Sequence, residues 1–525
     1  MRDLKDLTLE EKIGQMLVFG FLSDIDETVI NNINNLKAGN IILFARNCKN
    51  NEQLFNLNKK LNQLISASTG IYPLISIDQE GGMVTRIQKE ATFFPGAMTI
   101  GATGSVDYSK FSGAQMGKEL LALGCNMNLA PTIDINNNPL NPVIGVRSFS
   151  DDPETVAKFG NAFIEGLQKE GVIATVKHFP GHGDTNLDSH LALPTVNRSI
   201  EELNKTELLP FIRAMDKGVA AVMSAHIVFP AYDSVPATIS KRILTDLLRN
   251  ELNYQGLLIS DSMEMKAVAD TIGSVESSIL AVQAGMDLLC LTHDQDLPEK
   301  VFKGLIKAVK DGSIPESRID EAVTRILKFK KQYQKQYQEG FLNKEFPEIR
   351  EMLLEKAPKD IVETILDQSL TLVKGEVFKP NGQTLLITTD PIALTIAEDD
   401  GNTSSLSSYI ERKTKGFTVK KIANDPTEEE VETVLEMAKV FKQIVFCSYN
   451  AILFKKQGTL IKTLNEKFGD KLYVISTRLP YDLHVEPKLL NYTCVYEYTP
   501  NSVRTLVRYL EGKIIPSGKP LGNML

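Results

Sequence analysis

Tryptophan is absent from this 525-residue sequence, and histidine occurs only six times. No apolar run reaches the roughly 18 residues of a transmembrane helix, so none is expected. The net charge is −8 and no segment is dense in lysine and arginine, which argues against a surface for nucleic acid or an anionic membrane. With 42% hydrophobic and 24% charged residues, the composition is that of a globular protein and excludes a disordered, collagen-like or coiled-coil chain.

Cysteine is scarce and scattered, and no two cysteines form a Cys-x-x-Cys pair. The five are Cys48, Cys125, Cys290, Cys447 and Cys494. An odd, dispersed set disfavours a disulfide framework or a zinc knuckle and favours reduced thiols. The segment from Met1 to Lys12 mixes both charge signs and lacks the apolar stretch of a signal peptide. We therefore predict a cytoplasmic protein, although a mature chain that had lost a secretion signal would look the same.

Short apolar runs alternate with longer amphipathic runs through the first 335 residues. Eight of the apolar runs are predicted strands: 15–21, 40–44, 74–77, 128–135, 173–176, 220–225, 257–260 and 288–291. Helical patterns lie between them, as at 51–68, 108–123, 153–169, 201–217 and 242–252. This alternation predicts an α/β fold with a (β/α)8 TIM-type barrel over residues 1–335. A doubly wound sheet is less favoured, because polar residues stand at the ends of many strands and not at one switch point.

The chain changes character after an amphipathic helix expected at 318–333. Residues 336–369 include a polar stretch rich in lysine and glutamate, and they predict a partly helical connector. From 370 to 525 the alternation resumes, with strands expected at 385–388, 418–422, 444–447, 472–476 and 493–496. Thr427 can cap a helix at 427–440, whose first turn carries three glutamates. The pattern predicts a smaller three-layer α/β sandwich domain.

The segment KHFPGHGDTNLDSH, from Lys177 to His190, concentrates reactive side chains in a loop after a predicted strand. Barrel enzymes carry their chemistry in such loops. Three interpretations are open: a solvated loop, a metal site, or an acid/base pair. The His-x3-His and Asp-x-His spacings match no zinc signature, which disfavours the metal site. Asp188 and His190 are two residues apart, so in an extended loop the carboxylate can fix the tautomer of the imidazole and raise its basicity.

Other predicted strands also end in polar side chains. Asp78 follows the strand at 74–77, and Asp261 follows the strand at 257–260. Arg147 lies in a loop after 128–135, and His226 ends the run that contains Met223. Each has a plain structural explanation on its own; Asp261, for example, is well placed to cap the following helix. Because the carboxyl ends of all barrel strands meet on one face, the combination favours an active site there.

These motifs resemble those of glycoside hydrolase family 3, in its β-N-acetylhexosaminidase branch. The resemblance rests on DQEGG from Asp78, NPVIGVRSF from Asn141, KHFPGHGDTNLDSH from Lys177 and SDSMEM from Ser260, which occur in the family's order. It implies that Asp261 is the nucleophile and that His190, paired with Asp188, is the general acid/base. It also implies a sugar-binding set of Asp78, Arg86, Arg147, Lys177 and His178, with Met223 and His226 as neighbours.

The resemblance implies an exo-acting, retaining β-N-acetylglucosaminidase whose substrate is a cell-wall fragment with N-acetylglucosamine linked to N-acetylmuramic acid. It implies no cofactor and no metal, and a small glycan as the partner, with no nucleic acid; the oligomeric state stays open. A phosphorylase on the same scaffold stays open, because a histidine acid/base repels incoming phosphate less than a carboxylate would. A β-glucosidase or a sugar-binding protein without catalysis is less favoured, since the Asp-Ser-His motif and Asp261 are present.

Two departures bear on how the sugar is held. Met83 stands where the family often has arginine in DQEGGRV, so the resemblance assigns no sugar contact to position 83, whereas Arg86 is kept. Without tryptophan, any stacking surface has to come from phenylalanine, tyrosine or aliphatic side chains. We therefore expect the first subsite to depend mainly on charged and polar hydrogen bonds.

Overall fold

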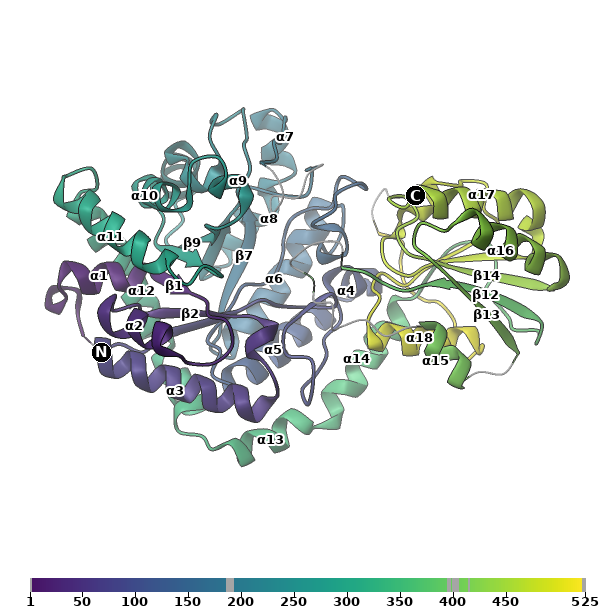
Figure 1. Cartoon of the computed structure of the whole chain (residues 1–525), viewed down its shortest axis with the longest axis horizontal. Helices are drawn as coiled ribbons and strands as arrows, with labels where there is room; N and C mark the ends of the chain where they lie inside the picture. The colour runs from purple at the N-terminus through teal and green to yellow at the C-terminus, as the bar shows by residue number, and fades with distance from the viewer. Residues whose placement is uncertain (1, 186–192, 394–397, 399–405, 414–415, 522–525) are drawn as a thin grey trace.

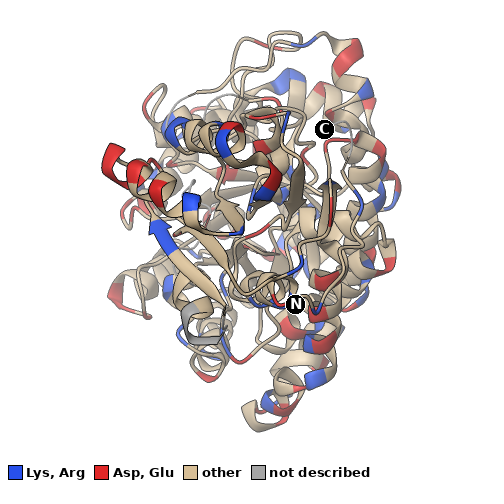
Figure 2. Ribbon diagram, turned by 90° about the vertical axis from the view of Figure 1, so that its right-hand side faces the viewer, with Lys and Arg blue, Asp and Glu red and all other residues tan. Residues whose placement is uncertain are grey.

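A closed barrel and a separate six-stranded sheet organise the chain in a computed structural model (Figure 1). The structure describes residues 2–185, 193–393, 398, 406–413 and 416–521. The barrel elements run from the N-terminus to α12, and the second sheet lies to one side of the barrel in Figure 1. Lysine and arginine are interspersed with aspartate and glutamate in the view of Figure 2, and no face in that view is predominantly basic.

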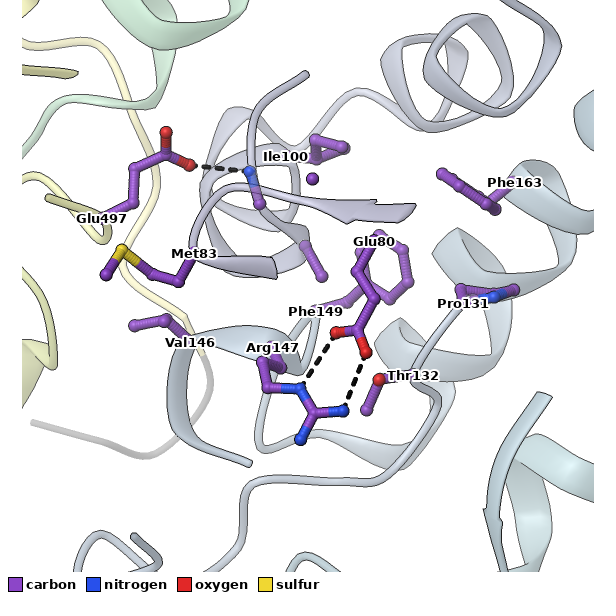
Figure 3. Close-up of a pocket in the computed structure, with 13 residues that line it drawn as sticks. Glu80, Met83, Ile100, Pro131, Thr132, Val146, Arg147, Phe149, Phe163 and Glu497 are labelled. Carbon is purple, nitrogen blue, oxygen red and sulfur yellow. Dashed lines mark hydrogen bonds and ion pairs between the residues drawn. The ribbon is translucent and has the colours of Figure 1, made fainter. Parts of the chain in front are cut away.

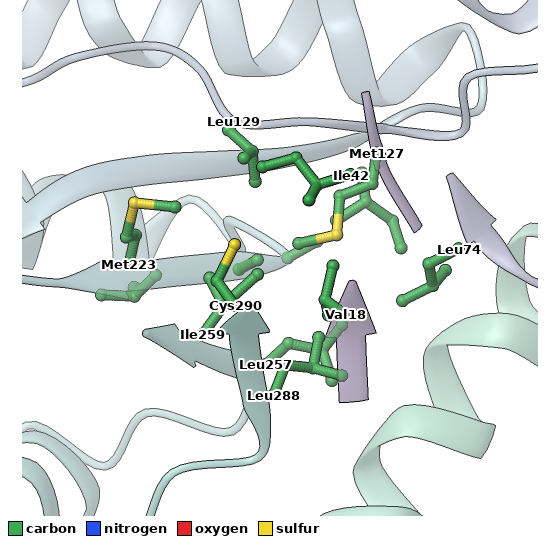
Figure 4. Packing of buried hydrophobic residues seen from close by; sticks show 14 of the residues in the cluster. Val18, Ile42, Leu74, Met127, Leu129, Met223, Leu257, Ile259, Leu288 and Cys290 are labelled. Atoms are coloured by element: carbon green, nitrogen blue, oxygen red, sulfur yellow. The ribbon is translucent and has the colours of Figure 1, made fainter. Parts of the chain in front are cut away.

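Eight parallel strands close the barrel in the order β1-β10-β9-β8-β7-β6-β3-β2, as the alternating pattern predicted. They are β1 (Leu17–Phe19), β2 (Asn40–Leu43), β3 (Leu74–Ile77), β6 (Met127–Asn128), β7 (Ile173–Phe179), β8 (Ala221–Ser224), β9 (Leu257–Ser262) and β10 (Leu288–Leu291). Only Asp261 and Ser262, at the end of β9, are less than fully buried. Side chains such as Val18, Ile42 and Leu257 fill the interior (Figure 4). The barrel interior is therefore a packed core and not a pore.

Helices connect the strands and cover the barrel. They are α1 (Leu9–Met16), α2 (Glu27–Asn35), α3 (Asn51–Thr69), α5 (Val106–Ala122), α6 (Pro153–Lys169), α7 (Ile200–Lys205), α8 (Leu208–Asp216), the π-helical η5 (Arg242–Glu251), α9 (Lys266–Ala269), α10 (Ser274–Ala284), α11 (Leu297–Lys310) and α12 (Glu316–Tyr337). Local sequence sets their ends: the Asp152 side chain accepts the Thr155 N–H at 2.8 Å before α6, and Gly70 closes α3 at a φ of 71°. No described helix is long and apolar enough to cross a membrane.

Two barrel segments differ from the expected elements. The strand expected at 128–135 is reduced to Met127–Asn128. Pro131 interrupts the ladder because it has no N–H, and the segment then pairs with β7 again, where the Ile133 N–H donates to the Lys177 carbonyl at 3.0 Å. The helix expected at 201–217 is broken between α7 and α8. At the break Glu207 is buried, and its carboxylate accepts the Asn137 side-chain amide at 2.7 Å.

The second domain is the predicted three-layer sandwich. Its sheet has the order β11-β16-β15-β14-β12-β13, and only the β11–β16 pair is antiparallel. The strands are β11 (Thr371–Lys374), β12 (Thr384–Thr389), β13 (Phe417–Ile422), β14 (Gln443–Ser448), β15 (Leu472–Ser476) and β16 (Asn491–Cys494). Leu385 and Ile387 pack with α16 (Glu428–Val440) and α17 (Lys455–Phe468), while Leu386 packs with α15 (Leu406–Lys413) and α18 (Pro500–Leu510). Sequence reasoning missed β11.

Two helices, α13 (Phe346–Leu354) and α14 (Lys356–Ser369), connect the barrel to the second sheet along the chain, and α13 lies beside α3 (Figure 1). Helix α14 runs beside α18 and beside α4 (Ala97–Thr103), a short helix of the barrel. The end of the described chain returns to α4, where the Lys519 N–H donates to the Ala102 carbonyl at 2.7 Å. The chain therefore meets the barrel again after completing the second sheet. Four of the five cysteines are buried, and no disulfide joins any of the five within the described residues.

Candidate active site

A cavity of about 510 Å³ opens at the carboxyl ends of the barrel strands. It is lined by seven of the ten predicted site residues: Asp78, Arg86, Arg147, Lys177, His178, Met223 and Asp261. Asp188 and His190 lie outside the described residues. His226 is not among the lining residues. Side chains from strands far apart in the sequence thus meet at one place on the barrel.

A network of charges forms one wall of this cavity. Lys177 Nζ, at the end of β7, lies 2.7 Å from Asp78 Oδ1 and 2.7 Å from Glu80 Oε1. Arg147 donates through Nε and Nη2 to the two oxygens of Glu80, at 2.9 and 2.8 Å (Figure 3). Arg147, Lys177 and Glu80 are all at most 7% exposed. Glu80, in the hairpin strand β4 (Gln79–Gly81), therefore fixes both cations at the cavity wall.

Burial and charge oppose each other in this network, and charge prevails. Burial alone would raise the pKa of Glu80, but Arg147 and Lys177 hold the pKa well below its usual range. Burial would lower the pKa of Lys177, and Asp78 and Glu80 raise it above its ordinary value instead. Both partners therefore stay ionised at neutral pH, so the cations are available as hydrogen-bond donors and not as acids.

Asp134 organises the histidines of the long loop. Its carboxylate accepts the backbone N–H groups of His178, at 3.0 Å, and of His182, at 2.7 Å. Its Oδ2 also lies 2.7 Å from His178 Nδ1, which leaves Nε2 as the nitrogen not bound to Asp134. Burial lowers the pKa of His182 to about 4, and neighbouring His178 adds to the effect. His182 is therefore a neutral residue that shapes the loop.

Asp261 lies within β9, one residue from its end, and is half-buried at the cavity. It does not cap the next helix, because the N-cap of α9 is Met265, which makes no side-chain cap bond. The Asp261 Oδ1 atom accepts the Ser262 N–H at 2.7 Å. Behind it, His226 Nε2 lies 2.8 Å from the Ser262 carbonyl oxygen and Nδ1 lies 2.8 Å from Thr238 Oγ1. His226 thus supports the backbone beside Asp261.

The cavity is also lined by Phe44, Arg46 and His293, which the sequence reasoning did not single out. The Arg46 guanidinium lies 4.3 Å above the centre of the Phe44 ring, and the His293 ring is 5.0 Å from the same ring. Arg46 also donates to the Thr292 carbonyl at 3.0 Å. Glu264 holds the loop after β10 by accepting the N–H groups of Thr292, His293 and Asp294. An aromatic surface is therefore present at the cavity even without tryptophan.

Glu80 and Asp134 were also missed, although the sequence contains a signal for each. Glu80 stands inside DQEGG, and Asp134 lies at the end of the apolar run 128–135. Met83, by contrast, does not line the large cavity; it is 3% exposed and packs in a cluster shared with the second domain. Within the part of the chain that the structure describes, no three His, Cys, Asp or Glu side chains are grouped to hold a metal ion.

The fold and the site together define a two-domain barrel protein whose charged cavity is built from the carboxyl ends of the barrel strands. Residues 8–329 match the family described as glycosyl hydrolase family 3 N terminal domain. The chain belongs to this family, as the motifs led us to expect.

Relatives with assigned names share the same part of the chain. Beta-hexosaminidase A of Pseudoalteromonas piscicida is 39% identical over 325 residues, which are 57% of this chain and 54% of that protein. The chain thus spans about half the length of that relative. Beta-hexosaminidase of Haemophilus influenzae is 38% identical over 266 residues, which are 50% of this chain and 74% of that protein.

A solved structure is similar to the chain through both domains. It is a glycoside hydrolase family 3 beta-N-acetylglucosaminidase from Paenibacillus sp. str. FPU-7, 37% identical, with a TM-score of 0.87 over 98% of each chain. The similarity therefore includes the second domain as well as the barrel.

Proposed function

We propose that this protein is an exo-acting, retaining β-N-acetylglucosaminidase. The observation that carries the proposal is the position of Asp261: a carboxylate in the floor of a charged cavity, at the carboxyl end of a barrel strand. The likeness to the Paenibacillus beta-N-acetylglucosaminidase over both domains supports it. The natural substrate that we propose is a cell-wall fragment with terminal N-acetylglucosamine linked to N-acetylmuramic acid.

Catalysis would proceed by two displacements at the anomeric carbon. The Asp261 carboxylate attacks that carbon and forms a covalent glycosyl ester, while protonated His190 gives its proton to the departing glycosidic oxygen. Neutral His190 then takes a proton from water, whose oxygen displaces Asp261 and restores the free carboxylate. Asp188 would orient the imidazole and stabilise its protonated form. Two inversions give net retention of configuration.

The charged wall would hold the sugar for this reaction. Lys177 and Arg147 are fixed by Glu80, so they can donate to sugar hydroxyl and acetamido oxygens without reorganising. Asp78, held by Lys177, can accept from a hydroxyl. His178, oriented by Asp134, presents Nε2. Phe44, which also lines the cavity, offers an apolar surface for the sugar or for its leaving group.

Aryl β-glycosides test the activity and the sugar preference together. Release of nitrophenol from the N-acetylglucosaminide but not from the glucoside is expected, and the reverse preference would overturn the proposal. Added inorganic phosphate should leave the rate unchanged and should yield no sugar 1-phosphate. A phosphate-dependent rate with that product would make the enzyme a phosphorylase.

Asp261→Asn tests the nucleophile. It should reduce kcat by at least about 10⁴-fold while the fold is retained. The matched control is Asp311→Asn, at an exposed aspartate outside the cavity whose carboxylate accepts the Ser313 N–H. The control should keep full activity, and an active Asp261→Asn enzyme would refute the assignment.

A further inference from the structure

The second domain packs the carboxyl end of its sheet against the barrel loops that carry Glu80 and Arg147. The residues concerned follow β15 and β16, at the carboxyl ends of those strands. Leu479 and Tyr481 come from the first loop, and Glu497 comes from the second. Leu479 is 1% exposed, Tyr481 is fully buried and Glu497 is 1% exposed. These three side chains are therefore buried, and each of them contacts the barrel.

A sequence of hydrogen bonds runs from Tyr481 to Arg147. The Tyr481 hydroxyl binds Asn136 of the barrel: it accepts from the side-chain amide and lies 3.4 Å from the backbone carbonyl oxygen. The Asn136 Oδ1 atom accepts the N–H of Gly145 at 3.0 Å. Gly145 begins the single turn η3 (Gly145–Arg147), in which the Arg147 N–H donates to the Ile144 carbonyl at 2.8 Å. Arg147 then binds Glu80, as described above.

Tight packing accompanies these bonds. Gly145 has a φ of 44°, and a Cβ atom added there would lie 2.9 Å from Leu479 Cδ2. The barrel residues Met83 and Val146 share one buried apolar cluster with Leu479 and Tyr481. Arg147 follows Val146, which packs against the second domain, and it binds Glu80, which lines the large cavity (Figure 3). The turn therefore cannot shift without disturbing the interface.

The loop that carries Tyr481 is itself held firmly in the second domain. The Leu479 N–H donates to Asn450 Oδ1 at 3.0 Å, and the Thr477 N–H donates to the Ser448 carbonyl at 2.9 Å. The Tyr492 hydroxyl donates to the Pro480 carbonyl at 2.9 Å. Tyr481 is thus a rigid support and not a side chain that follows the movements of the barrel.

Glu497 makes a second contact beside the first. Its Oε2 accepts the Gly96 N–H at 2.7 Å and the Thr99 hydroxyl at 2.7 Å, both at the start of α4. Burial raises the pKa of this carboxyl. Gly82, two residues after Glu80, passes so close that an added Cβ would lie 3.3 Å from Glu497 Oε2. The two contacts therefore bracket the hairpin of Glu80 and the turn of Arg147.

We propose that Tyr481 is a positioning residue for the sugar site: through Asn136, the second domain fixes the turn that aims Arg147 into the cavity. The role rests on the proposed function, since Arg147 would contact the sugar. In this view the second domain supports the first subsite from behind, and none of its described residues lines the large cavity.

Tyr481→Phe in the full chain tests the proposal, because it removes the hydroxyl and keeps the ring. We expect kcat/KM on an aryl N-acetyl-β-glucosaminide to fall about 10-fold and the inhibition constant of free N-acetylglucosamine to rise by a similar factor. Tyr509→Phe is the matched control: this buried hydroxyl of α18 accepts the Phe378 N–H at 3.1 Å inside the second domain. Each variant loses a buried hydroxyl that takes part in two hydrogen bonds, so a similar small decrease in Tm is expected, but only Tyr481→Phe should change the kinetics.

A double-mutant cycle with Asn136→Ala separates positioning from general destabilisation. If Tyr481 acts through Asn136, the double variant should be no slower than Asn136→Ala alone. Wild-type kinetics in Tyr481→Phe, equal losses in Tyr481→Phe and Tyr509→Phe, or additive losses in the cycle would each overturn the proposal. A wild-type enzyme without activity on the N-acetylglucosaminide would instead overturn the proposed function.

Discussion

Glu80 binds Arg147 with both carboxylate oxygens, and its Oε1 also lies 2.7 Å from Lys177 Nζ. One buried anion thus sets the positions of two cations that face the cavity. Charged donors fixed in this way can act on a substrate without reorganisation, which is the property that a sugar site needs.

Glu80→Gln should disturb this arrangement more than its small change in shape suggests. The amide keeps the volume but leaves two buried cations with less negative charge, and breaking a buried ion pair costs about 3–5 kcal/mol. We expect a lower free energy of unfolding and a kcat/KM about 10²-fold lower. Glu165→Gln is the control, because Glu165 is 63% exposed in its pair with Lys110 and should change neither quantity measurably.

Asp134→Asn tests whether the orientation of His178 matters. The carboxylate accepts from two backbone N–H groups and approaches His178 Nδ1, whereas an amide offers one acceptor oxygen and adds a donor. We expect kcat/KM to fall at least about 10-fold, with a decrease in Tm, because a buried donor loses its partner. Unchanged kinetics in a destabilised variant would show that Asp134 only stabilises the fold.

The stability of the protein should depend on pH through His182. Because the pKa of His182 is about 4 in the folded chain and about 6.5 in the unfolded chain, the unfolded state binds the proton more tightly. Stability from this residue is complete above about pH 6.5 and is lost as the pH falls towards 4, at up to about 1.4 kcal/mol per pH unit.

Urea unfolding between pH 7.5 and pH 4.5 measures this effect. His182→Asn should show a smaller loss of stability over that range than the wild type, whatever its stability at pH 7.5. His484→Asn, at an exposed histidine of the second domain, should retain the wild-type dependence. Equal pH dependence in His182→Asn and the wild type would contradict the burial argument.

His190→Ala should discriminate between leaving groups. A nitrophenolate leaves without a proton, whereas the alcohol of a disaccharide needs one, and general acid catalysis contributes about 10²–10⁴-fold. The ratio of kcat/KM on the aryl glycoside to that on the disaccharide should therefore rise by about that factor. An equal loss on both substrates would assign His190 a different role.

Much of the fold could be predicted because its signals are local. Runs such as 74–77 and 288–291 are short, apolar and buried on both faces, and the structure has strands at the same residues. The failures occurred where distant contacts decide. Thr371–Lys374 is a strand only because β16 pairs with it, and the run 128–135 is interrupted at Pro131 before Thr132 pairs with β7 again.

The site residues that follow predicted strands could be predicted from their residue types. The residues that matter because of an ion pair or a ring contact with a distant residue could not. Asp78, Lys177 and Asp261 stood out because each ends a predicted strand. Glu80 was overlooked because its importance comes from Arg147, 67 residues away in the sequence. The Phe44 surface was overlooked for the same reason, because the His293 ring reaches it from the loop after β10, far away in the sequence.

Met83 makes the position after DQEGG part of the contact between the two domains. Its side chain is 3% exposed and lies in the apolar cluster that the barrel shares with Leu479 and Tyr481 of the second domain. An arginine at this position would place a charge in that cluster, which is costly unless the charge is paired. The departure from DQEGGRV is thus explained in this chain by the domain that covers it.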